Sequence, residues 1–298
     1  MTGQIAAASF DDVHHSDAGA AGVVLAGGRS TRMGTPKAAL EWHGSTLLYR
    51  TAALLTRTVD GPVVVVAAPG QQLPELPVGV QVVEDPVEGL GPMRGIATGL
   101  AAVADLAPAA FVCSTDMPFL HPAFVARVLR EFVLTDTDVV LPTARGFRQP
   151  LAAVYRTALA GLIANLASDG ELRPGMLFEH CRLQRIDDKE LLADAVLARF
   201  DPDLESVMNV NSPDEYEVAR ARPPAEVTVQ CFGALASAGR RGPRTVRAAT
   251  LGAAAQAVDI PLDQYVMAAL NGDLMTRDQH LPLVAGDTVA LLSADAGG

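Results

Sequence analysis

Residues 23–40 read VVLAGGRSTRMGTPKAAL, and this stretch decides the fold that the sequence predicts. Its first three residues form a short apolar run of the kind that a buried central strand requires. Gly27 and Gly28 follow, and backbone without side chains lets a run of N–H groups approach an anion. Arg32 and Lys37 then add two cations, one a planar fork and the other a compact charge on a flexible stem. A strand, a glycine loop and two spaced cations together predict a site for polyphosphate.

Two common phosphate-binding motifs do not fit this stretch. Lys37 lies nine residues after Gly28 and no Gly-Lys-Ser or Gly-Lys-Thr occurs, so the loop is not G-x-x-x-x-G-K-[ST]. The spacing of Gly27, Gly28 and Gly34 does not fit G-x-G-x-x-G either. Residues 25–37 instead match L-A-G-G-x-S-x-R-M-G-x-x-K at every defined position. The chain therefore resembles the sugar-phosphate and cofactor nucleotidyltransferases, and among them the molybdenum cofactor guanylyltransferases. The resemblance implies that the nucleotide is bound by Leu25, Ala26, Gly27, Gly28 and Lys37. It also implies that two cations, Arg32 and Lys37, are catalytic.

Apolar runs alternate with helix-like stretches through the first two thirds of the chain. Further strands are expected at 63–67, 80–83, 109–113 and 138–141, and helices at 45–58, 92–105, 121–133 and 157–168. This alternation predicts an α/β fold with a doubly wound, mostly parallel sheet, and the resemblance implies a Rossmann-like nucleotidyltransferase. Ligands of such sheets bind beyond the carboxyl ends of the strands, where the glycine loop would lie.

The pattern changes at residues 221–225, where ARPPA indicates a short proline hinge. Residues 20–221 are expected to form the nucleotidyltransferase domain, and residues 1–19 a flexible leader to which no function is assigned. Residues 226–298 predict a second, small α+β domain. Its order is strand, strand, helix, strand, strand, at 227–232, 245–248, 250–258, 265–271 and 288–292.

The composition limits the classes of function. The 298 residues carry a net charge of −11, which argues against a nucleic-acid-binding surface and leaves the local cations for a small anionic ligand. No apolar run approaches the length of a membrane span, and residues 1–20 lack the pattern of a signal peptide. The cysteines, Cys113, Cys181 and Cys231, have no metal-ligand spacing and cannot form a full disulfide framework. A reducing cytoplasm is expected.

Asp116 follows the apolar run 109–113 and should project from a strand end into the same crevice as the glycine loop. Its carboxylate is a candidate ligand for Mg²⁺, which prefers hard oxygen atoms and commonly joins one or two carboxylates to substrate phosphates. The alternative is that Asp116 caps the following helix, with Pro118 near its first turn. The resemblance implies that Asp116 binds Mg²⁺ and nucleotide and takes part in catalysis.

Asp85 lies just past another expected strand and precedes a G-L-G-P turn at 89–92. The resemblance implies that Asp85 contacts the nucleotide, and a surface turn is the alternative. Arg94 stands where the family usually has a small residue, and we expect it to point to solvent rather than to phosphate. The family often has an asparagine just after the second strand, where this chain has Ala67 and Ala68, so only a backbone contact is expected there.

Two later segments complete the resemblance, QPL at 149–151 and NVNSP at 209–213. It implies that Gln149, Asn209 and Asn211 bind the acceptor, a polar pterin that carries a phosphate. The alternative for the second segment is that Asn211 or Ser212 caps a helix beginning nearby.

The reaction implied by the resemblance is attack of the molybdopterin phosphate on the α-phosphorus of GTP, with Mg²⁺ as cofactor and release of pyrophosphate. Gly27 favours GTP, because cytidylyltransferase relatives tend to have alanine there and a missing methyl leaves room for the larger purine. Two alternatives stay open. One is transfer from CTP or to another phosphorylated acceptor, and the other is a carrier or scaffold that binds nucleotide without turnover.

The second domain resembles the small-subunit sulfur carriers of molybdopterin synthase, which are ubiquitin-like β-grasp proteins. The matching segments are LNGD at 270–273, AGDTV at 285–289 and the terminal Gly297-Gly298. The resemblance implies sulfur transfer at that terminus, with a sulfur-carrier activating enzyme and the large subunit of molybdopterin synthase as partners. Terminal glycines are also common in disordered chain ends, which is the alternative.

Overall fold

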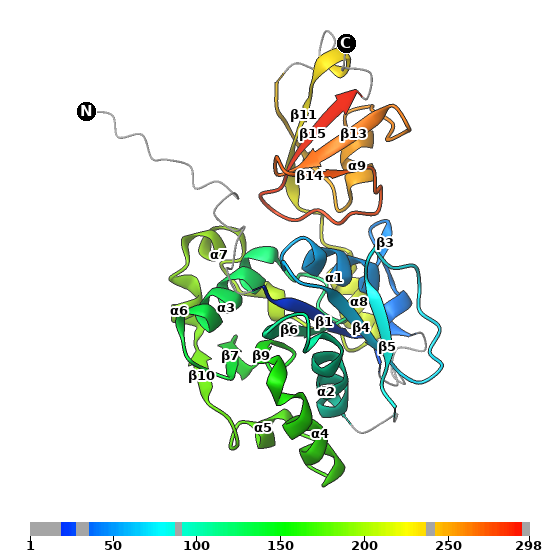
Figure 1. Cartoon of the computed structure of the whole chain (residues 1–298). Coiled ribbons are helices and arrows are strands. Elements are labelled where there is room, and N and C mark those ends of the chain that lie inside the picture. The colour runs from blue at the N-terminus through cyan, green and yellow to red at the C-terminus, as the bar shows by residue number, and fades with distance from the viewer. Residues whose placement is uncertain (1–18, 28–35, 87–90, 237–241, 294–298) are drawn as a thin grey trace, which may run out of the picture. The chain divides into compact units, whose positions relative to one another are not determined.

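The computed structural model describes residues 19–27, 36–86, 91–236 and 242–293 (Figure 1). These residues divide into two compact units, one with most of the chain up to Arg220 and the other with the chain from Ala221 onward. The first unit is built on an eight-stranded sheet and the second on a five-stranded sheet. In the described ranges no helix is both long and apolar enough to cross a membrane.

The large sheet is wound in both directions from its first strand. Its order is β10-β7-β9-β6-β1-β4-β5, with β8 paired to β7. β1 is parallel to β4 and β6, and β9 is antiparallel to both of its neighbours. The prediction of a doubly wound, mostly parallel sheet is therefore confirmed, with β9 as a reversed strand inside it. The strands are β1 (Ala21–Leu25), β4 (Val63–Ala67), β5 (Gln81–Glu84), β6 (Ala109–Ser114), β7 (Val139–Ala144), β8 (Phe147–Arg148), β9 (Ala152–Arg156) and β10 (Leu183–Ile186).

Helices cover both faces of this sheet, and successive residues of β1 point to opposite faces. Val24 packs in the core on the side of α1 and α3, whereas Val23 packs in the core on the side of α2 and α4. This is the burial expected of a central parallel strand. The helices of the first unit are α1 (Leu47–Thr56), α2 (Pro92–Val103), α3 (Pro122–Leu134), α4 (Ala160–Ser168), α5 (Pro174–Leu177), α6 (Asp188–Leu192), α7 (Ala195–Phe200) and α8 (Pro213–Arg220).

One glycine sets the distance between α2 and the sheet. A Cβ atom at Gly99 would lie 2.3 Å from Val23 Cγ1, so the helix can rest on β1 only because this position has no side chain. Residues 157–168 were expected to form one helix. They instead begin with a 3₁₀ turn, η3 (Thr157–Leu159), before α4 starts.

An aromatic cluster lies beside the hairpin of β2 (Glu41–Trp42) and β3 (Ser45–Thr46). The ring of Trp42 meets that of Phe119 edge to face, with centroids 5.6 Å apart, and lies 6.3 Å from that of Tyr216 on α8. The buried side chain of Val210 packs in the same cluster. The chain segments that follow β6 and precede α8 are thereby packed together.

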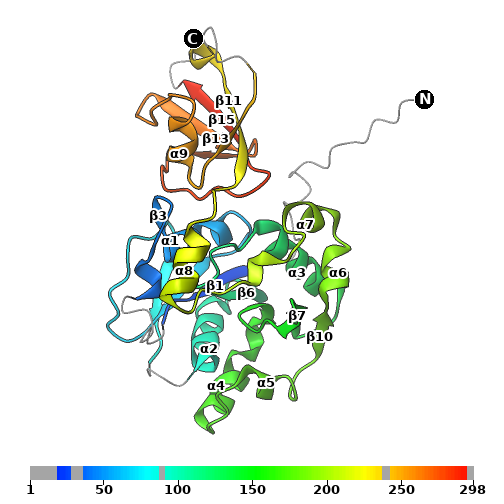
Figure 2. The same ribbon diagram turned by 180° about the vertical axis from the view of Figure 1, so that it is seen from behind.

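In its described residues the second unit has a five-stranded sheet and one α-helix, which Figures 1 and 2 show from opposite sides. The strand order is β12-β11-β15-β13-β14, with β11 and β15 parallel and the other pairs antiparallel. Four strands were expected, and the additional one is the three-residue β14. The elements are β11 (Glu226–Cys231), β12 (Arg244–Arg247), α9 (Leu251–Gln256), β13 (Val266–Leu270), β14 (Leu274–Thr276) and β15 (Thr288–Ser293).

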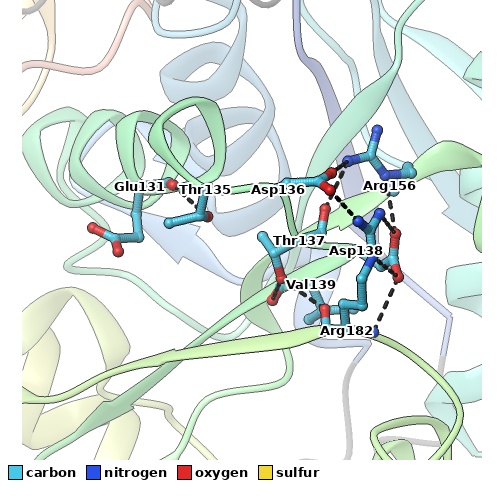
Figure 3. A network of polar contacts seen from close by, with 8 residues as sticks. All are labelled: Glu131, Thr135, Asp136, Thr137, Asp138, Val139, Arg156 and Arg182. Carbon is cyan, nitrogen blue, oxygen red and sulfur yellow. Dashed lines mark hydrogen bonds and ion pairs between the residues drawn. The ribbon is translucent and has the colours of Figure 1, made fainter.

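A polar network ties β7, β9 and β10 together at the edge where β7 and β10 begin (Figure 3). Asp138 accepts hydrogen bonds from Arg182 Nε at 3.1 Å and Nη2 at 2.9 Å, and from Arg156 Nε at 3.1 Å. The hydrogen bonds from Arg182 are the main reason that the pKa of Asp138 falls from 3.8 to about 2. This edge is opposite the carboxyl ends of the parallel strands, so the network stabilises the fold rather than forming part of the candidate site.

Candidate active site

The carboxyl ends of the central strands are joined by backbone hydrogen bonds beyond the strands themselves. Val66 C=O accepts from Ala26 N–H at 2.9 Å and from Gly27 N–H at 3.1 Å. On the next strand, Asp85 N–H donates to Ala67 C=O at 2.8 Å. The predicted nucleotide-binding residues of β1 and β5 therefore leave the sheet along one shared edge, as a doubly wound fold requires.

Three predicted site residues, far apart in sequence, meet at this edge. Lys37 begins the short helix η2 (Lys37–Ala39), and its Nζ lies 2.9 Å from Asp116 Oδ2 and 2.9 Å from Asn211 Oδ1. Asp116 and Asn211 are 79 and 174 residues from Lys37 in the chain. The side chains of Lys37 and Asp116 are 19% and 18% exposed, so a ligand can reach the pair.

Asp116 is held by its own loop and by the segment before α8. Ser114 Oγ donates to Asp116 Oδ1, and Val210 N–H donates to Asp116 C=O at 2.9 Å. From α1, buried Arg50 donates through Nε to Pro118 C=O at 2.9 Å. Sequence reasoning missed Arg50, because an arginine inside an apolar helix gives no local signal that it braces a distant loop.

Both capping alternatives can be decided from the helix starts. The cap of α3 is His121, whose Nδ1 accepts from Ala123 N–H at 3.1 Å, so Asp116 does not cap this helix. At α8, Ser212 Oγ accepts from Glu215 N–H at 3.2 Å. The side chain of Asn211 thus leaves the capping role to Ser212 and contacts Lys37.

Arg94 differs from its expected position. Its Nε lies 3.6 Å from Asp85 Oδ1, and its side chain is only 23% exposed. The expectation that Arg94 points to solvent was wrong, because a carboxylate within reach offers the guanidinium a stronger partner than water alone. Any ligand of Asp85 would meet this cation beside it.

The remaining predicted site residues either lie apart from the Lys37 cluster or fall outside the described residues. Gln149 donates from Nε2 to Ala144 C=O at 3.2 Å, at the end of β7, and Asn209 is exposed. The hydrogen bond of Gln149 therefore joins it to the end of β7 and not to the Lys37 cluster. Gly28, Arg32, Gly297 and Gly298 lie outside the described residues, as do the leader residues 1–18.

Gly27 has a packing reason as well as the base-selecting one expected from sequence. A Cβ atom there would lie 3.1 Å from Ala68 N and 3.5 Å from Ala67 C. A side chain would thus press on the backbone after β4. The closeness of the two strand ends itself favours glycine, so Gly27 is weaker evidence for a purine than its motif suggests.

Gln71 is a further residue at this edge that sequence reasoning missed. Its Oε1 accepts from Ala68 N–H at 2.9 Å and its Nε2 donates to Ala26 C=O at 3.1 Å. The N–H of Ala68, where only a backbone contact was expected, is therefore already engaged by a side chain. The Pro69-Gly70 turn that precedes Gln71 was the available sequence signal, because such a turn reverses the chain and returns Gln71 to the strand end.

The residues around Lys37 fit a divalent cation. Two hard oxygen atoms, Asp116 Oδ2 and Asn211 Oδ1, already hold the Lys37 ammonium between them. Among the described residues there is no cluster of three or more His, Cys, Asp or Glu side chains that could hold a metal ion. A site with one carboxylate matches the way proteins hold Mg²⁺ together with substrate phosphates and water.

Fold and comparisons place the chain in a known class. Residues 22–186 match the MobA-like NTP transferase domain. The crystal structure of molybdopterin-guanine dinucleotide biosynthesis protein A from Archaeoglobus fulgidus superposes with a TM-score of 0.54 over 67% of this chain and 96% of that one; at 20% identity this shows the fold alone. The first unit is thus an α/β nucleotidyltransferase.

Sequence relatives narrow this class to a family. A protein of Mycobacterium tuberculosis named as a probable molybdenum cofactor guanylyltransferase is 44% identical over 169 residues, covering 56% of this chain and 82% of the relative. One of the same name from Mycobacterium avium is 40% identical, covering 56% and 84%. The chain belongs to the MobA-like NTP transferase family.

Proposed function

We propose that this protein transfers GMP from GTP to the phosphate of molybdopterin and releases pyrophosphate. The observation that carries the proposal is the convergence of Lys37, Asp116 and Asn211 at the carboxyl edge of the sheet. The names of relatives at 40–44% identity support guanylyl transfer to the molybdenum cofactor as the reaction.

The chain needs to supply no nucleophile in this reaction. The acceptor is a phosphate monoester, which is already anionic near neutral pH, so catalysis consists of aligning two anions and neutralising charge at the reacting phosphorus. The Lys37 ammonium lies where it can exchange its carboxylate and amide partners for phosphate oxygens of the nucleotide. Asp116, helped by the nearby oxygen of Asn211, would hold Mg²⁺, which when bound supplies further positive charge to the phosphates.

The other assigned roles follow the edge of the sheet. Leu25, Ala26, Gly27 and Asp85 would contact the nucleotide, and Gly28 and Arg32 would add backbone N–H groups and a second cation for its phosphates. Asn209, Asn211 and Gln149 would bind the acceptor.

The test is to mix purified protein with Mg²⁺, molybdopterin and either GTP or CTP, and to identify the product by mass. The expected product is the guanine dinucleotide form of the cofactor with GTP and much less product with CTP. Formation of no guanylyl product, or of the cytidylyl product alone, would overturn the proposal.

For the second unit we propose a β-grasp sulfur carrier for molybdopterin synthesis. Its strand order, with a parallel central pair flanked by antiparallel strands, supports a β-grasp fold. Two of the three segments that carry the resemblance, 270–273 and 285–289, are hydrogen-bonded to each other. Asn271 Nδ2 donates to Asp287 Oδ1 at 2.9 Å, and Thr288 N–H donates to Asn271 Oδ1 at 2.8 Å. These segments therefore support the fold, and the carrier chemistry rests on Gly297 and Gly298.

The carrier role predicts a defined covalent change at Gly298. Its carboxylate would be adenylated by ATP with release of pyrophosphate, after which a sulfur donor displaces AMP and leaves a thiocarboxylate. The full chain, incubated with an activating enzyme, ATP and a sulfur donor, should gain the mass of one sulfur-for-oxygen exchange. An unchanged mass under conditions that modify a known carrier would contradict this role. The large subunit of molybdopterin synthase is the expected recipient.

A further inference from the structure

The ends of β1 and β4 are linked by a side chain as well as by the backbone hydrogen bonds of Ala26 and Gly27 to Val66. Gln71 contacts both strand ends, with Nε2 3.1 Å from Ala26 C=O and Oε1 2.9 Å from Ala68 N. Ala26 is directly followed by Gly27, and Ala68 is the first residue after β4. Because Ala67 and Ala68 have no polar side chain, Gln71 supplies an amide group that this strand end otherwise lacks.

A tight turn aims Gln71 back at the strand ends. Gln71 N–H donates to Ala68 C=O at 3.0 Å, which closes a four-residue turn with Pro69 and Gly70 at its centre. Gly70 has a φ of +66°, and this combination of proline, glycine and positive φ is typical of a type II turn. The turn fixes the backbone of Gln71, so its side chain returns to the edge that the chain has just left.

The orientation of the Gln71 amide follows from its partners. Ala26 offers a carbonyl oxygen, which only the amide NH₂ can bond, and Ala68 offers an N–H, which only the amide oxygen can accept. Each partner thus fits one end of the amide and rejects the other. A carboxylate of the same shape would satisfy Ala68 but would place an oxygen against the oxygen of Ala26.

We propose that Gln71 is a positioning residue of the nucleotide site. Its amide clamps the end of β1 to the end of β4, and so fixes the backbone of Ala26 and Gly27 in the conformation that receives the nucleotide. The inference rests on the proposed function, because it assumes that these residues contact GTP. Removing the Gln71 amide frees two hydrogen-bonding groups and the backbone of Ala26 and Gly27 loses this support, which should weaken GTP binding by about tenfold or more.

The test compares two isosteric changes with a matched control in the full chain. Gln71→Met removes both hydrogen bonds, and Gln71→Glu keeps the acceptor but opposes Ala26 C=O. Gln72→Glu makes the same charge change at the exposed next residue. Calorimetry with GTP and Mg²⁺ gives affinity, steady-state kinetics gives KM and kcat, and thermal melting reports the fold.

The expected order of GTP affinity is wild type and Gln72→Glu first, then Gln71→Met, then Gln71→Glu. The KM for GTP should rise about tenfold in Gln71→Met, while kcat and the KM for molybdopterin stay within twofold of wild type. Equal GTP affinity in wild type and both folded Gln71 variants would overturn the inference. The inference would also be overturned if the Gln71 variants lost kcat and both substrate affinities to the same extent and melted at a lower temperature. That result would mean that Gln71 only stabilises the fold. A wild-type protein that binds no GTP would instead overturn the proposed function.

Discussion

Lys37 is the side chain on which the proposed chemistry of the first unit depends most. It contacts the candidate metal ligand Asp116 and the candidate acceptor residue Asn211 at 2.9 Å each. Lys37→Ala should lower kcat/KM for guanylyl transfer by about 10²–10³, the usual cost of removing one preorganised group that stabilises transition-state charge. Steady-state kinetics with GTP and molybdopterin measures the effect.

The chain contains its own control for this change. Lys189 is exposed on α6, and it is the other lysine of the sequence. Lys189→Ala should leave kcat/KM within twofold of wild type. Similar activity in the two variants would mean that the charge of Lys37 has no part in the reaction.

At the level of single residues, motifs in the sequence identify candidate side chains but do not show which residues these side chains contact. Lys37, Asp116 and Asn211 were all identified from motifs, but their contacts span 79 and 174 residues and depend on the fold. The contacts of Arg94 and Gln71 were missed although some of their partners are near in sequence. Arg94 on α2 meets Asp85 after β5, and Gln71 reaches back to the end of β1, so both contacts depend on how the chain folds.

The contact between α2 and β1 makes a stability prediction at the level of elements. Gly99→Ala should lower the free energy of unfolding by about 1–3 kcal/mol, because the new methyl group meets Val23 at 2.3 Å and the helix must shift. Gly161→Ala on α4 is the control, since a Cβ there meets nothing within 4 Å. It should be neutral or stabilising by about 0.5 kcal/mol. Urea unfolding measures the free energy of unfolding of both variants. Equal effects of the two substitutions would contradict close packing at Gly99.

The polar network at the other edge makes a prediction about pH. Asp138 has a folded pKa of about 2 against an ordinary value of 3.8, so its contribution is present above pH 3.8 and is lost as the pH falls toward 2. Asp138→Asn should therefore destabilise the protein by about 1 kcal/mol at pH 7, and the difference from wild type should shrink in acid.

Urea unfolding at a series of pH values between 7 and 3 measures this difference. Asp169→Asn, at an exposed position after α4, serves as control and should show no such trend. A penalty for Asp138→Asn that is constant with pH would contradict the role of its charge.

Among the elements, those with strong local signals were predicted closely. The run of valines at 63–66 gives β4 its predicted bounds, because a continuous β-branched segment favours a buried strand. The strands β9 and β10 were not predicted, so the reversed direction of β9 was missed with them, and β14 was not predicted either. A strand's direction depends on its neighbours, and three residues, two of them exposed, carry too little pattern to identify β14.

At the scale of the whole molecule, the two proposed activities should be separable. Deletion of Gly297 and Gly298 should abolish sulfur loading but leave guanylyl transfer within twofold of wild type, because the Lys37 cluster belongs to the first unit. Asp116→Asn should do the reverse. Parallel assays of both variants measure this, and loss of both activities in either folded variant would contradict the separation.

The central claim is that the first unit transfers the α-phosphoryl group of GTP, with its nucleoside, to molybdopterin. The most direct test uses two parallel reactions. One contains GTP labelled at the α-phosphate, and the other contains GTP labelled at the γ-phosphate. The α-label should appear in the dinucleotide product and the γ-label in pyrophosphate, and both should fail to do so in Asp116→Asn. Transfer of the γ-label to molybdopterin, or absence of α-label from the product, would contradict the account.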